Sequence, residues 1–362
     1  MKILHTESSG GFGGQEIRIL REAEGMRDRG HEVIMAVQSG GDLVQAAREA
    51  GFLVYEVSFS KKRAMQDLFA LVGIIKRHNI DIVNTHSSWD AWLGGVAAKV
   101  TGRRIIRTRH LSTSIRPGIN SRLLYRFLAD QVVTTCETTA NVICRQAGLT
   151  VDRCRSIPTG VAENFLPDNA ANSFRQKFKI QSDEIVVGTV CVLRSWKGVQ
   201  HLLQAAKILE GEPRLRWLIV GDGPAKEFLE HLAESLQLGG KVIFTGYQPD
   251  PMSAIAAMDI FALLSTANEG VSQASLQAAL LGKPLVTTDI GGLGEVCIEG
   301  QTGYKCPEAS PADVAIAIKQ LADNPQLRQT FGANARHLAL GKFTLKSTLD
   351  EMEKVYGLLQ EA

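Results

Sequence analysis

The sequence predicts an α/β protein made of two successive domains, each a parallel sheet covered by helices on both faces. The chain has 362 residues, and at ~100–200 residues per domain this length suggests two domains. Short apolar segments alternate with helical stretches along the chain, which is typical of parallel sheets between layers of helices. With 44% hydrophobic and 22% charged residues, the composition excludes disordered, collagen-like and membrane-spanning proteins.

The first elements form a strand–loop–helix–strand unit. An apolar strand over residues 2–6 runs into a glycine-rich loop, and a helical pattern follows with Gly30 as its C-terminal stop. The next strand is predicted over residues 32–37. Further strands of this domain are predicted over residues 80–84, 105–108 and 131–135, with helical stretches between them.

Turn-forming residues interrupt this pattern at Ile157-Pro158-Thr159-Gly160 and again near Pro167. We therefore place an N-terminal domain over residues 1–165 and a C-terminal domain over residues 166–344. An amphipathic helix is expected over the final stretch, residues 345–359. Strands of the second domain are predicted over residues 185–192, 216–220, 241–245, 260–264 and 284–287.

The chain carries no sign of export or of a metal-binding cysteine pattern. Its apolar stretches fall short of the ~18 residues of a membrane helix. The N-terminus turns polar at His5, before a signal-peptide core could form, so we expect a cytoplasmic protein. Six cysteines occur without a Cys-x-x-Cys pair, which favours reduced thiols over a disulfide framework or a zinc site.

Ligands of open α/β sheets bind at the carboxyl ends of the strands, so the loops there are the candidate sites. The loop Gly10-Gly11-Phe12-Gly13-Gly14 joins a strand to a helix. Glycines let the backbone approach a ligand, and a helix N-terminus offers free N–H groups to an anion. The loop fits neither Gly-x-Gly-x-x-Gly nor the Walker A pattern, and a flexible turn is the alternative interpretation.

Two loops of the second domain carry charged side chains. Arg194 and Lys197 lie three residues apart before a helix, where both can bind one diphosphate, although a solvated surface is the alternative. Glu269 precedes another helix and either interacts with its N-terminal dipole or accepts hydrogen bonds from a substrate hydroxyl. Gln277 follows two turns later, where its amide can face the same site.

The order of these motifs resembles the retaining glycosyltransferases of family 4, which have the GT-B fold of two Rossmann-like domains facing across a cleft. The resemblance covers nearly the whole chain, and it implies that the C-terminal helix, residues 345–362, packs back on the N-terminal domain. The matching segments are Gly13-Gly14-Gln15-Glu16, Arg29-Gly30-His31-Glu32-Val33, Ile157-Pro158-Thr159-Gly160-Val161, Arg194-Ser195-Trp196-Lys197-Gly198, Gly221-Asp222-Gly223-Pro224 and Thr288-Asp289-Ile290-Gly291-Gly292.

The resemblance implies a role for each matching residue. Arg194 and Lys197 would hold the donor diphosphate, and Glu269 would contact the donor sugar. His110, which follows an N-domain strand, would lie near the reacting sugar. The remaining donor-binding positions would be Gly13 and Gly14, which close over the phosphates, together with Gly221, Gly270, Val271, Ser272 and Gln277.

The sequence departs from the family pattern at two positions. Gln277 replaces the second glutamate, which usually binds the ribose; its amide still offers an acceptor and a donor. Gly270-Val271-Ser272 stands where the family usually has Gly-Phe-Gly.

The resemblance implies transfer of a sugar from a nucleotide-diphosphate sugar, which we expect to be a UDP-sugar, with retention of the anomeric configuration. The acceptor would attack from the front face, and the leaving phosphate would take its proton. The chain contains no Asp-x-Asp sequence, so we expect no metal at the donor phosphates and no cofactor besides the co-substrate. An epimerase or hydrolase on the same fold and a catalytically silent nucleotide-sugar binder are the alternatives.

The acceptor side is suggested by charge. Residues 1–165 carry 22 Lys and Arg against 16 Asp and Glu, and residues 103–126 hold seven arginines with no acidic residue. Such a block is typical of an anion-binding surface, although a solvated basic face is the plain alternative. We expect it to bind an anionic glycan, a lipopolysaccharide or a lipid-linked acceptor, with peripheral contact to an anionic membrane. Few aromatics accompany it, which argues against nucleic acid. The candidate acceptor contacts are His86, Arg107, Arg109 and Arg116.

Overall fold

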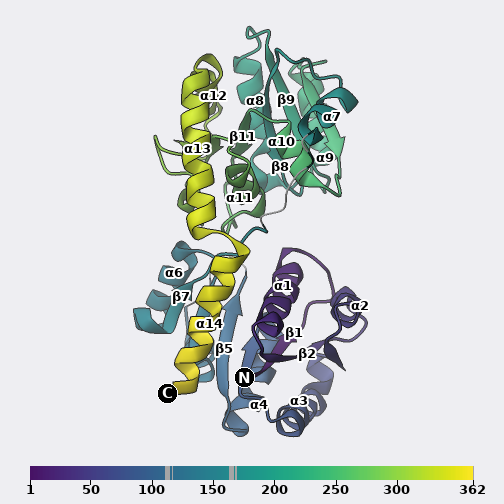
Figure 1. The fold of residues 1–362 in the computed structure, drawn as a ribbon, viewed down its shortest axis with the longest axis vertical. Coiled ribbons are helices and arrows are strands. Elements are labelled where there is room, and N and C mark those ends of the chain that lie inside the picture. The colour runs from purple at the N-terminus through teal and green to yellow at the C-terminus, as the bar shows by residue number, and fades with distance from the viewer. Residues whose placement is uncertain (111–114, 116, 163–166, 168, 362) are drawn as a thin grey trace. The chain divides into compact units, whose positions relative to one another are not determined.

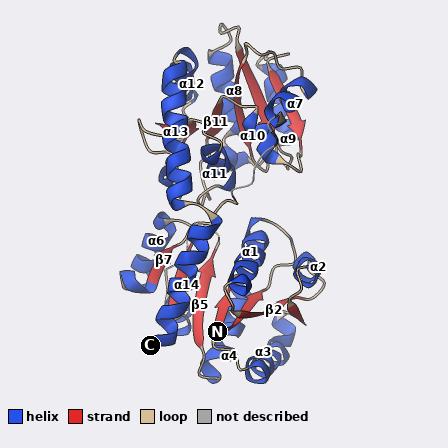
Figure 2. Cartoon of the chain, viewed as in Figure 1, coloured by secondary structure: helices blue, strands red, loops and turns tan. Residues whose placement is uncertain are grey.

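The computed structural model describes residues 1–361 apart from 111–114, 116, 163–166 and 168. The chain divides into two compact units: unit 1 comprises Met1–Thr159 and Thr348–Ala362, and unit 2 comprises Gly160–Ser347. Each unit has one parallel sheet with flanking helices (Figure 1 and Figure 2), and the predicted α/β class is confirmed.

Unit 1 contains a seven-stranded sheet in the order β3-β2-β1-β4-β5-β6-β7. The order changes direction between β1 and β4, so right-handed crossovers place helices on both faces. Its strands are β1 (Lys2–Glu7), β2 (Glu32–Gln38), β3 (Leu53–Val57), β4 (Ile82–Thr85), β5 (Arg104–Arg109), β6 (Gln131–Thr134) and β7 (Cys154–Ser156). Its helices are α1 (Gly14–Asp28), α2 (Asp42–Glu49), α3 (Ala64–His78), α4 (Ser88–Val100), α5 (Ile119–Arg122) and α6 (Glu137–Ala147), with a π-helical turn over Leu123–Leu128.

Unit 2 contains a six-stranded sheet in the order β10-β9-β8-β11-β12-β13, which changes direction between β8 and β11. Its strands are β8 (Ile185–Val190), β9 (Leu215–Val220), β10 (Val242–Gly246), β11 (Ile260–Leu263), β12 (Leu285–Thr287) and β13 (Gly303–Lys305). Its helices are α7 (Ala170–Lys177), α8 (Val199–Ile208), α9 (Lys226–Ser235), α10 (Pro251–Ala256), α11 (Gln273–Leu280), α12 (Pro311–Asp323) and α13 (Pro325–Lys342).

Apolar runs in the central strands explain why these sheets are buried. In unit 1, Leu4 and Val83 are fully buried in a core that α3 and α4 complete. In unit 2, Trp217 and Ile260 occupy the equivalent core beneath α8 and α12. Strands that are covered by helices on both faces are continuous apolar segments in the sequence, and the central strands show this pattern.

The last helix, α14 (Leu345–Glu361), begins in unit 2 and continues into unit 1 (Figure 1), where it contacts α1. Leu349 lies directly over Gly25, where an added Cβ would come within 2.3 Å of the leucine Cδ1. The buried Tyr356 hydroxyl donates to the Glu22 carboxylate over 2.8 Å. No helix in the described part of the chain is long and apolar enough to cross a membrane.

Candidate active site

The loops that follow β8, β9 and β11 form the candidate donor site of unit 2. Because the strands are parallel, their carboxyl ends share one edge of the sheet, and β8 and β11 flank the point where the strand order reverses. The loops after β8 and β9 touch at Gly221, which has a φ of +132°. An added Cβ there would lie 1.9 Å from the Cys191 carbonyl oxygen, so only glycine fits.

Lys197 and Glu269 form an ion pair across this edge. The Glu269 carboxylate is buried, with 5% of the residue exposed, and its Oε1 also accepts a hydrogen bond from Ser265 Oγ over 2.7 Å. Ser265 is in turn fixed through its carbonyl, which accepts from Thr288 Oγ1. The predicted diphosphate-binding and sugar-binding residues are thus brought together by the fold.

Arg194 takes a different position from Lys197. Its guanidinium lies over the ring of Trp196, 5.1 Å from the ring centroid, in a cation–π contact. A short 3₁₀ turn, Ser195–Lys197, separates the two cations before α8 begins. Arg194 therefore retains an unburied charge near the start of α8, while Lys197 is held by Glu269.

The start of α11 is capped by Ser272, whose Oγ accepts from the Ser275 N–H over 3.3 Å. Ser272, and not Glu269, supplies the capping hydrogen bond of α11, and the Glu269 carboxylate is bound by Lys197 and Ser265. Val271 is buried between Glu269 and the cap, whereas Gly270 is half-buried there, and Gln277 is half-buried within α11.

In unit 1 the glycine loop leads into α1, with Gly13 as the N-cap and Gly14 as the first helical residue. The Gly13 N–H donates to the Glu16 carboxylate over 2.8 Å. The loop is anchored further back by the Asp42 N–H, which donates to the Gly10 carbonyl over 3.2 Å. The first free N–H of this helix, that of Gly13, is thus already hydrogen-bonded to a carboxylate of the protein, that of Glu16.

Two buried carboxylates that the sequence analysis missed support this loop. Glu7, at the end of β1, accepts hydrogen bonds from Ser9 N over 2.6 Å and from Gln15 Nε2 over 2.5 Å, and a third from Ser87 Oγ. Burial, followed by the nearby Asp90 charge, raises the pKa of Glu7 to about 7. An acidic residue directly before a glycine loop is the signal that could have identified it.

Asp90 is fully buried at the start of α4. It accepts from Thr6 Oγ1 over 2.9 Å, from Ser8 Oγ over 3.1 Å and from the His86 N–H over 2.8 Å. Burial raises its pKa, against the opposing effect of the Arg107 cation. Asp90 therefore ties the end of β1 to the loop that follows β4.

Three histidines lie in a row at the carboxyl ends of β1, β4 and β5. His5 Nδ1 is 2.8 Å from His86 Nε2, and His86 Nδ1 is 2.9 Å from His110 Nε2. Neighbouring rings stack, with centroids 5.1 and 5.2 Å apart. His86 is only 2% exposed and has both ring nitrogens engaged, so it lies behind His110 rather than at the surface.

The predicted basic block, residues 103–126, is not one surface. Arg107 is buried, and in the described part of the chain its Nε and Nη1 have no hydrogen-bond partner. Arg109 Nη1 donates to Tyr125 Oη over 3.0 Å, whereas Arg104 lies at the opposite, amino end of β5. The expectation of a single surface is wrong because β5 carries these arginines from one sheet edge to the other. Arg116 lies outside the described residues.

A hollow of about 510 Å³ lies at the amino ends of β5, β6 and β7. We name this surface the basic–apolar patch. Its charged and apolar lining consists of Lys99, Arg104, Arg126, Phe127, Asp130, Asp152, Arg153, Arg155, Leu358 and Leu359. Phe127 is 61% exposed, which is unusual for a phenylalanine. The patch combines exposed apolar side chains with five cations and two aspartates, and Lys99 forms an ion pair with Asp130 over 2.7 Å.

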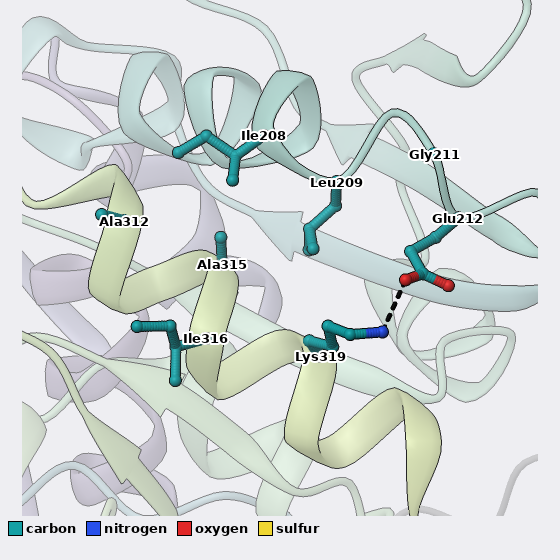
Figure 3. A pocket seen from close by; sticks show the side chains of 8 residues that line it. All are labelled: Ile208, Leu209, Gly211, Glu212, Ala312, Ala315, Ile316 and Lys319. Carbon is teal, nitrogen blue, oxygen red and sulfur yellow. Dashed lines mark hydrogen bonds and ion pairs between the residues drawn. The ribbon is translucent and has the colours of Figure 1, made fainter.

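Unit 2 has an apolar hollow of about 490 Å³ between the end of α8 and α12. Figure 3 shows Ile208 and Ile316 beside it, with the ion pair between Lys319 and Glu212 at one side. Because α8 runs back from the carboxyl edge of the sheet, this hollow lies at the amino end and is separate from Lys197 and Glu269.

Both halves of the chain match models of one enzyme class. The model described as Glycosyltransferase Family 4 matches residues 12–165, and the model described as Glycosyl transferases group 1 matches residues 171–338. The chain is 26% identical over 299 residues to the N-acetyl-alpha-D-glucosaminyl L-malate synthase of Bacillus anthracis, covering 79% of this chain and 77% of that protein. It is 24% identical to the Capsular polysaccharide biosynthesis glycosyltransferase CapM of Staphylococcus aureus, covering 93% and 92%.

Solved structures share the fold. The structure of Anabaena Alr3699/HepE in complex with UDP superposes with a TM-score of 0.87 at 22% identity, covering 99% of this chain and 100% of that one. A glycosyltransferase from Rickettsia africae ESF-5 gives a TM-score of 0.89 at 22% identity, covering 99% and 98%. With both family models matched and this architecture, the chain belongs to the glycosyltransferases of group 1 and family 4 and has the GT-B fold.

Proposed function

We propose that the protein transfers a sugar from a UDP-sugar to an anionic surface-glycan or glycolipid acceptor, with retention of the anomeric configuration. The observation that carries the proposal is the buried Glu269 carboxylate held beside Lys197 at the carboxyl edge of the unit 2 sheet. A cation for the diphosphate and an acceptor for sugar hydroxyls stand side by side there, which is the pair of groups that a nucleotide-sugar needs.

Donor binding exchanges partners within this pair. Phosphate oxygens take the Lys197 ammonium from Glu269, and Arg194 adds a second cation from the other end of the 3₁₀ turn. The freed Glu269 carboxylate then accepts hydrogen bonds from sugar hydroxyls, while Ser265 keeps it in place. Charge grows on the diphosphate as the glycosidic bond breaks, so the two cations stabilise the transition state more than the ground state.

Retention follows from attack on the face that the leaving group vacates. The acceptor oxygen forms the new bond to the anomeric carbon as the bond to the phosphate oxygen breaks, and the departing phosphate oxygen takes the acceptor proton. Glu269 positions the sugar and does not bond to it. His110 in unit 1 is assigned to the donor sugar, with Gly13 and Gly14 assigned to the phosphates and Gly221, Gly270, Val271, Ser272 and Gln277 to the rest of the donor.

The relatives support this choice of donor and acceptor. Anabaena Alr3699/HepE has been crystallised in complex with UDP, with UDP and glucose, and with UDP-glucose. CapM is a glycosyltransferase of capsular polysaccharide biosynthesis, and WaaB is a lipopolysaccharide outer core galactosyltransferase. Arg109 remains the acceptor candidate nearest the surface at the carboxyl edge of unit 1, beside the half-buried His110.

The basic–apolar patch supports peripheral contact with an anionic membrane. Arginine and lysine are attracted to acidic headgroups, and exposed apolar side chains such as Phe127 enter the interface. We propose that this contact holds the enzyme at the inner leaflet of the membrane, on the cytoplasmic side, close to a lipid-linked acceptor.

The test measures thermal stabilisation by UDP, GDP and UDP-sugars, with and without a metal chelator, and then turnover with an acceptor panel. Stabilisation by UDP that survives chelation, followed by formation of a glycoside with the donor's anomeric configuration, is expected. Conversion of the donor without an acceptor would point to an epimerase or hydrolase. Binding without any turnover would leave a silent nucleotide-sugar binder, and an absence of nucleotide binding would reject the donor site.

A further inference from the structure

The row of His5, His86 and His110 contains two hydrogen bonds in which every nitrogen involved belongs to an imidazole. The contacts are 2.8 Å between His5 Nδ1 and His86 Nε2 and 2.9 Å between His86 Nδ1 and His110 Nε2. Each contact needs a donor on one side and an acceptor on the other. A neutral imidazole has one of each, so the tautomers of the three rings are coupled.

The three rings are neutral. Burial lowers the pKa of His5 to about 4. Burial, together with neighbouring histidines and the cations of Arg107 and Arg18, lowers the pKa of His86 well below its usual value. Burial, together with the cations of Arg18 and Arg107, also lowers the pKa of His110 well below its usual value. Neutral rings leave only two arrangements, in which all three protons sit on Nδ1 or all three sit on Nε2.

The inner end of the row separates these arrangements. His5 Nε2 is buried and has no hydrogen-bond partner in the described part of the chain. If all three protons sat on Nε2, this position would be a buried N–H without an acceptor. If they sit on Nδ1, it is an unpaired acceptor, and proteins tolerate unpaired buried acceptors more readily than unpaired N–H groups.

We infer that His5 and His86 are positioning residues that hold His110 in the Nδ1–H form, so that His110 presents an N–H donor at the carboxyl edge of unit 1. His5 Nδ1–H donates to His86 Nε2, and His86 Nδ1–H donates to His110 Nε2. Only His110 of the three is more than marginally exposed. The row thus fixes which nitrogen of the half-buried His110 carries the proton, and it does so from two buried residues.

The consequence for transfer rests on the proposed function. An Nδ1–H donor suits an oxygen of the sugar or of the phosphate, whereas a bare Nδ1 would face these oxygens with a lone pair. His86 therefore contributes to the reaction through His110 and not by contact with the acceptor, which replaces the acceptor role predicted for it from the sequence.

The experiment records nitrogen chemical shifts of the histidines in the ¹⁵N-labelled full-length protein at alkaline pH, where the tautomer of each neutral ring is resolved. His5, His86 and His110 are assigned by their loss in single variants. All three are expected as Nδ1–H, which is the form disfavoured in free histidine. A wild-type His110 in the Nε2–H form overturns the inference, and this measurement needs no substrate.

The positioning role is tested with two substitutions of His86. His86→Leu removes the donor to His110, and His110 is expected to shift toward Nε2–H while kcat falls about tenfold and the donor Kd changes less than about twofold. His86→Asn offers an amide N–H near the position of Nδ1 and is expected to restore most of the Nδ1–H signal and of kcat. An unchanged His110 signal in His86→Leu overturns the positioning role.

The matched control is His78→Leu, which removes a histidine of the same unit whose Nε2 lies 2.7 Å from Tyr55 Oη, away from the row. It is expected to leave the signal of His110 and kcat unchanged. If the tautomers are as inferred but no sugar donor is turned over, the inference stands and the proposed function fails. If turnover occurs with His110 in the Nε2–H form, the reverse holds.

Discussion

Lys197 and Glu269 are the central pair of the candidate donor site. Each would be costly to bury alone, and their ion pair together with the Ser265 hydrogen bond offsets that cost. The same pairing keeps both side chains in one orientation before a donor arrives. We expect that preorganisation to reduce the conformational entropy lost on binding.

Replacing Lys197 with alanine is expected to weaken UDP binding by about 10- to 100-fold, because one charge-assisted contact is worth roughly 1.5–3 kcal/mol. Titration calorimetry with UDP measures the effect. Lys207→Ala is the control, since Lys207 pairs with Glu210 at the far end of α8. Equal affinities of the Lys197 variant and the wild type would remove Lys197 from the donor site.

Glu7 is expected to make the free energy of unfolding depend on pH. Its pKa rises from 4.5 in the unfolded chain to about 7 in the fold, so the folded state holds the proton more tightly. Ionisation of Glu7 therefore lowers the free energy of unfolding as pH rises from about 4.5 to 7. Glu7→Gln cannot ionise, and relative to wild type it is expected to gain up to about 1.4 kcal/mol per pH unit across that window, then stay constant.

The comparison uses urea unfolding of both proteins at a series of pH values. His5, His86 and His110 have lowered pKa values, so both proteins should lose stability on the acid side of about pH 6.5, and the difference between them isolates Glu7. A difference that does not change with pH would show that Glu7 ionises normally in the fold.

The sequence predicted Lys197 and Glu269 as candidates because each follows a strand and belongs to a matched motif. It did not predict that Glu7, Asp90 and His5 act together with His86. Those contacts depend on β1 lying beside β4, a pairing between segments about 80 residues apart. The spacing of residues along the chain does not show directly that β1 and β4 are neighbours in the sheet.

At the scale of elements, the turn after β12 supports the donor site. Gly291 has a φ of +61°, and an added Cβ would lie 1.7 Å from the Glu269 carbonyl oxygen. Gly291→Ala must therefore displace the backbone that carries Glu269. The expected loss of stability is about 2–4 kcal/mol, with weaker UDP binding in the fraction that folds.

Thermal and urea unfolding measure this loss. Gly211→Ala is the control, because an added Cβ there meets nothing within 4 Å, and its effect should stay within about 0.5 kcal/mol. If Gly291→Ala were as stable as Gly211→Ala, the close contact between the two loops would be wrong.

The buried hydroxyl of Tyr356 links α14 to α1 through its hydrogen bond to Glu22. Tyr356→Phe removes the hydrogen bond to Glu22 and the one accepted from Asn84 Nδ2 over 3.2 Å. Glu22 is fully buried, so losing a donor should lower the free energy of unfolding by about 1–3 kcal/mol. Tyr247→Phe, at a residue that is 72% exposed, is expected to change it by less than about 0.5 kcal/mol. Similar values for both variants would contradict the anchoring role.

Ten strands were predicted near their observed positions because they are apolar and bounded by turns; nine of them are central, and β10 is an edge strand. Three were missed: β3, β7 and β13. β3 lies at a sheet edge and exposes Leu53, while β7 and β13 have three residues each and include charged ones. Edge strands with water on one side lack the continuous apolar run that identifies a buried strand.

Across the whole molecule, charge is divided between the two halves of the sequence, and the basic excess gathers partly in the basic–apolar patch. Arg126→Ala combined with Phe127→Ser is expected to lower the affinity for anionic lipid vesicles about tenfold, because a basic residue near the surface contributes ~1 kcal/mol and an inserted aromatic adds to it. Co-sedimentation with phosphatidylserine vesicles measures the loss.

Phe69→Ser is the matched control for that surface. Phe69 is 68% exposed in unit 1 but lies on α3, outside the patch, so this variant should bind vesicles as the wild type does. Binding that is independent of salt, or equal in both variants, would reject the patch as the membrane-facing surface.

The course of α14 has a consequence for synthesis on the ribosome. Unit 2 is an uninterrupted stretch, Gly160–Ser347, and can be complete as soon as it has emerged. The first segment of unit 1 is translated before unit 2, yet unit 1 lacks Leu349 and Tyr356 until α14 leaves the exit tunnel. The half that is made first is therefore finished last, and until then the surface of α1 around Gly25 and Glu22 is open to chaperones.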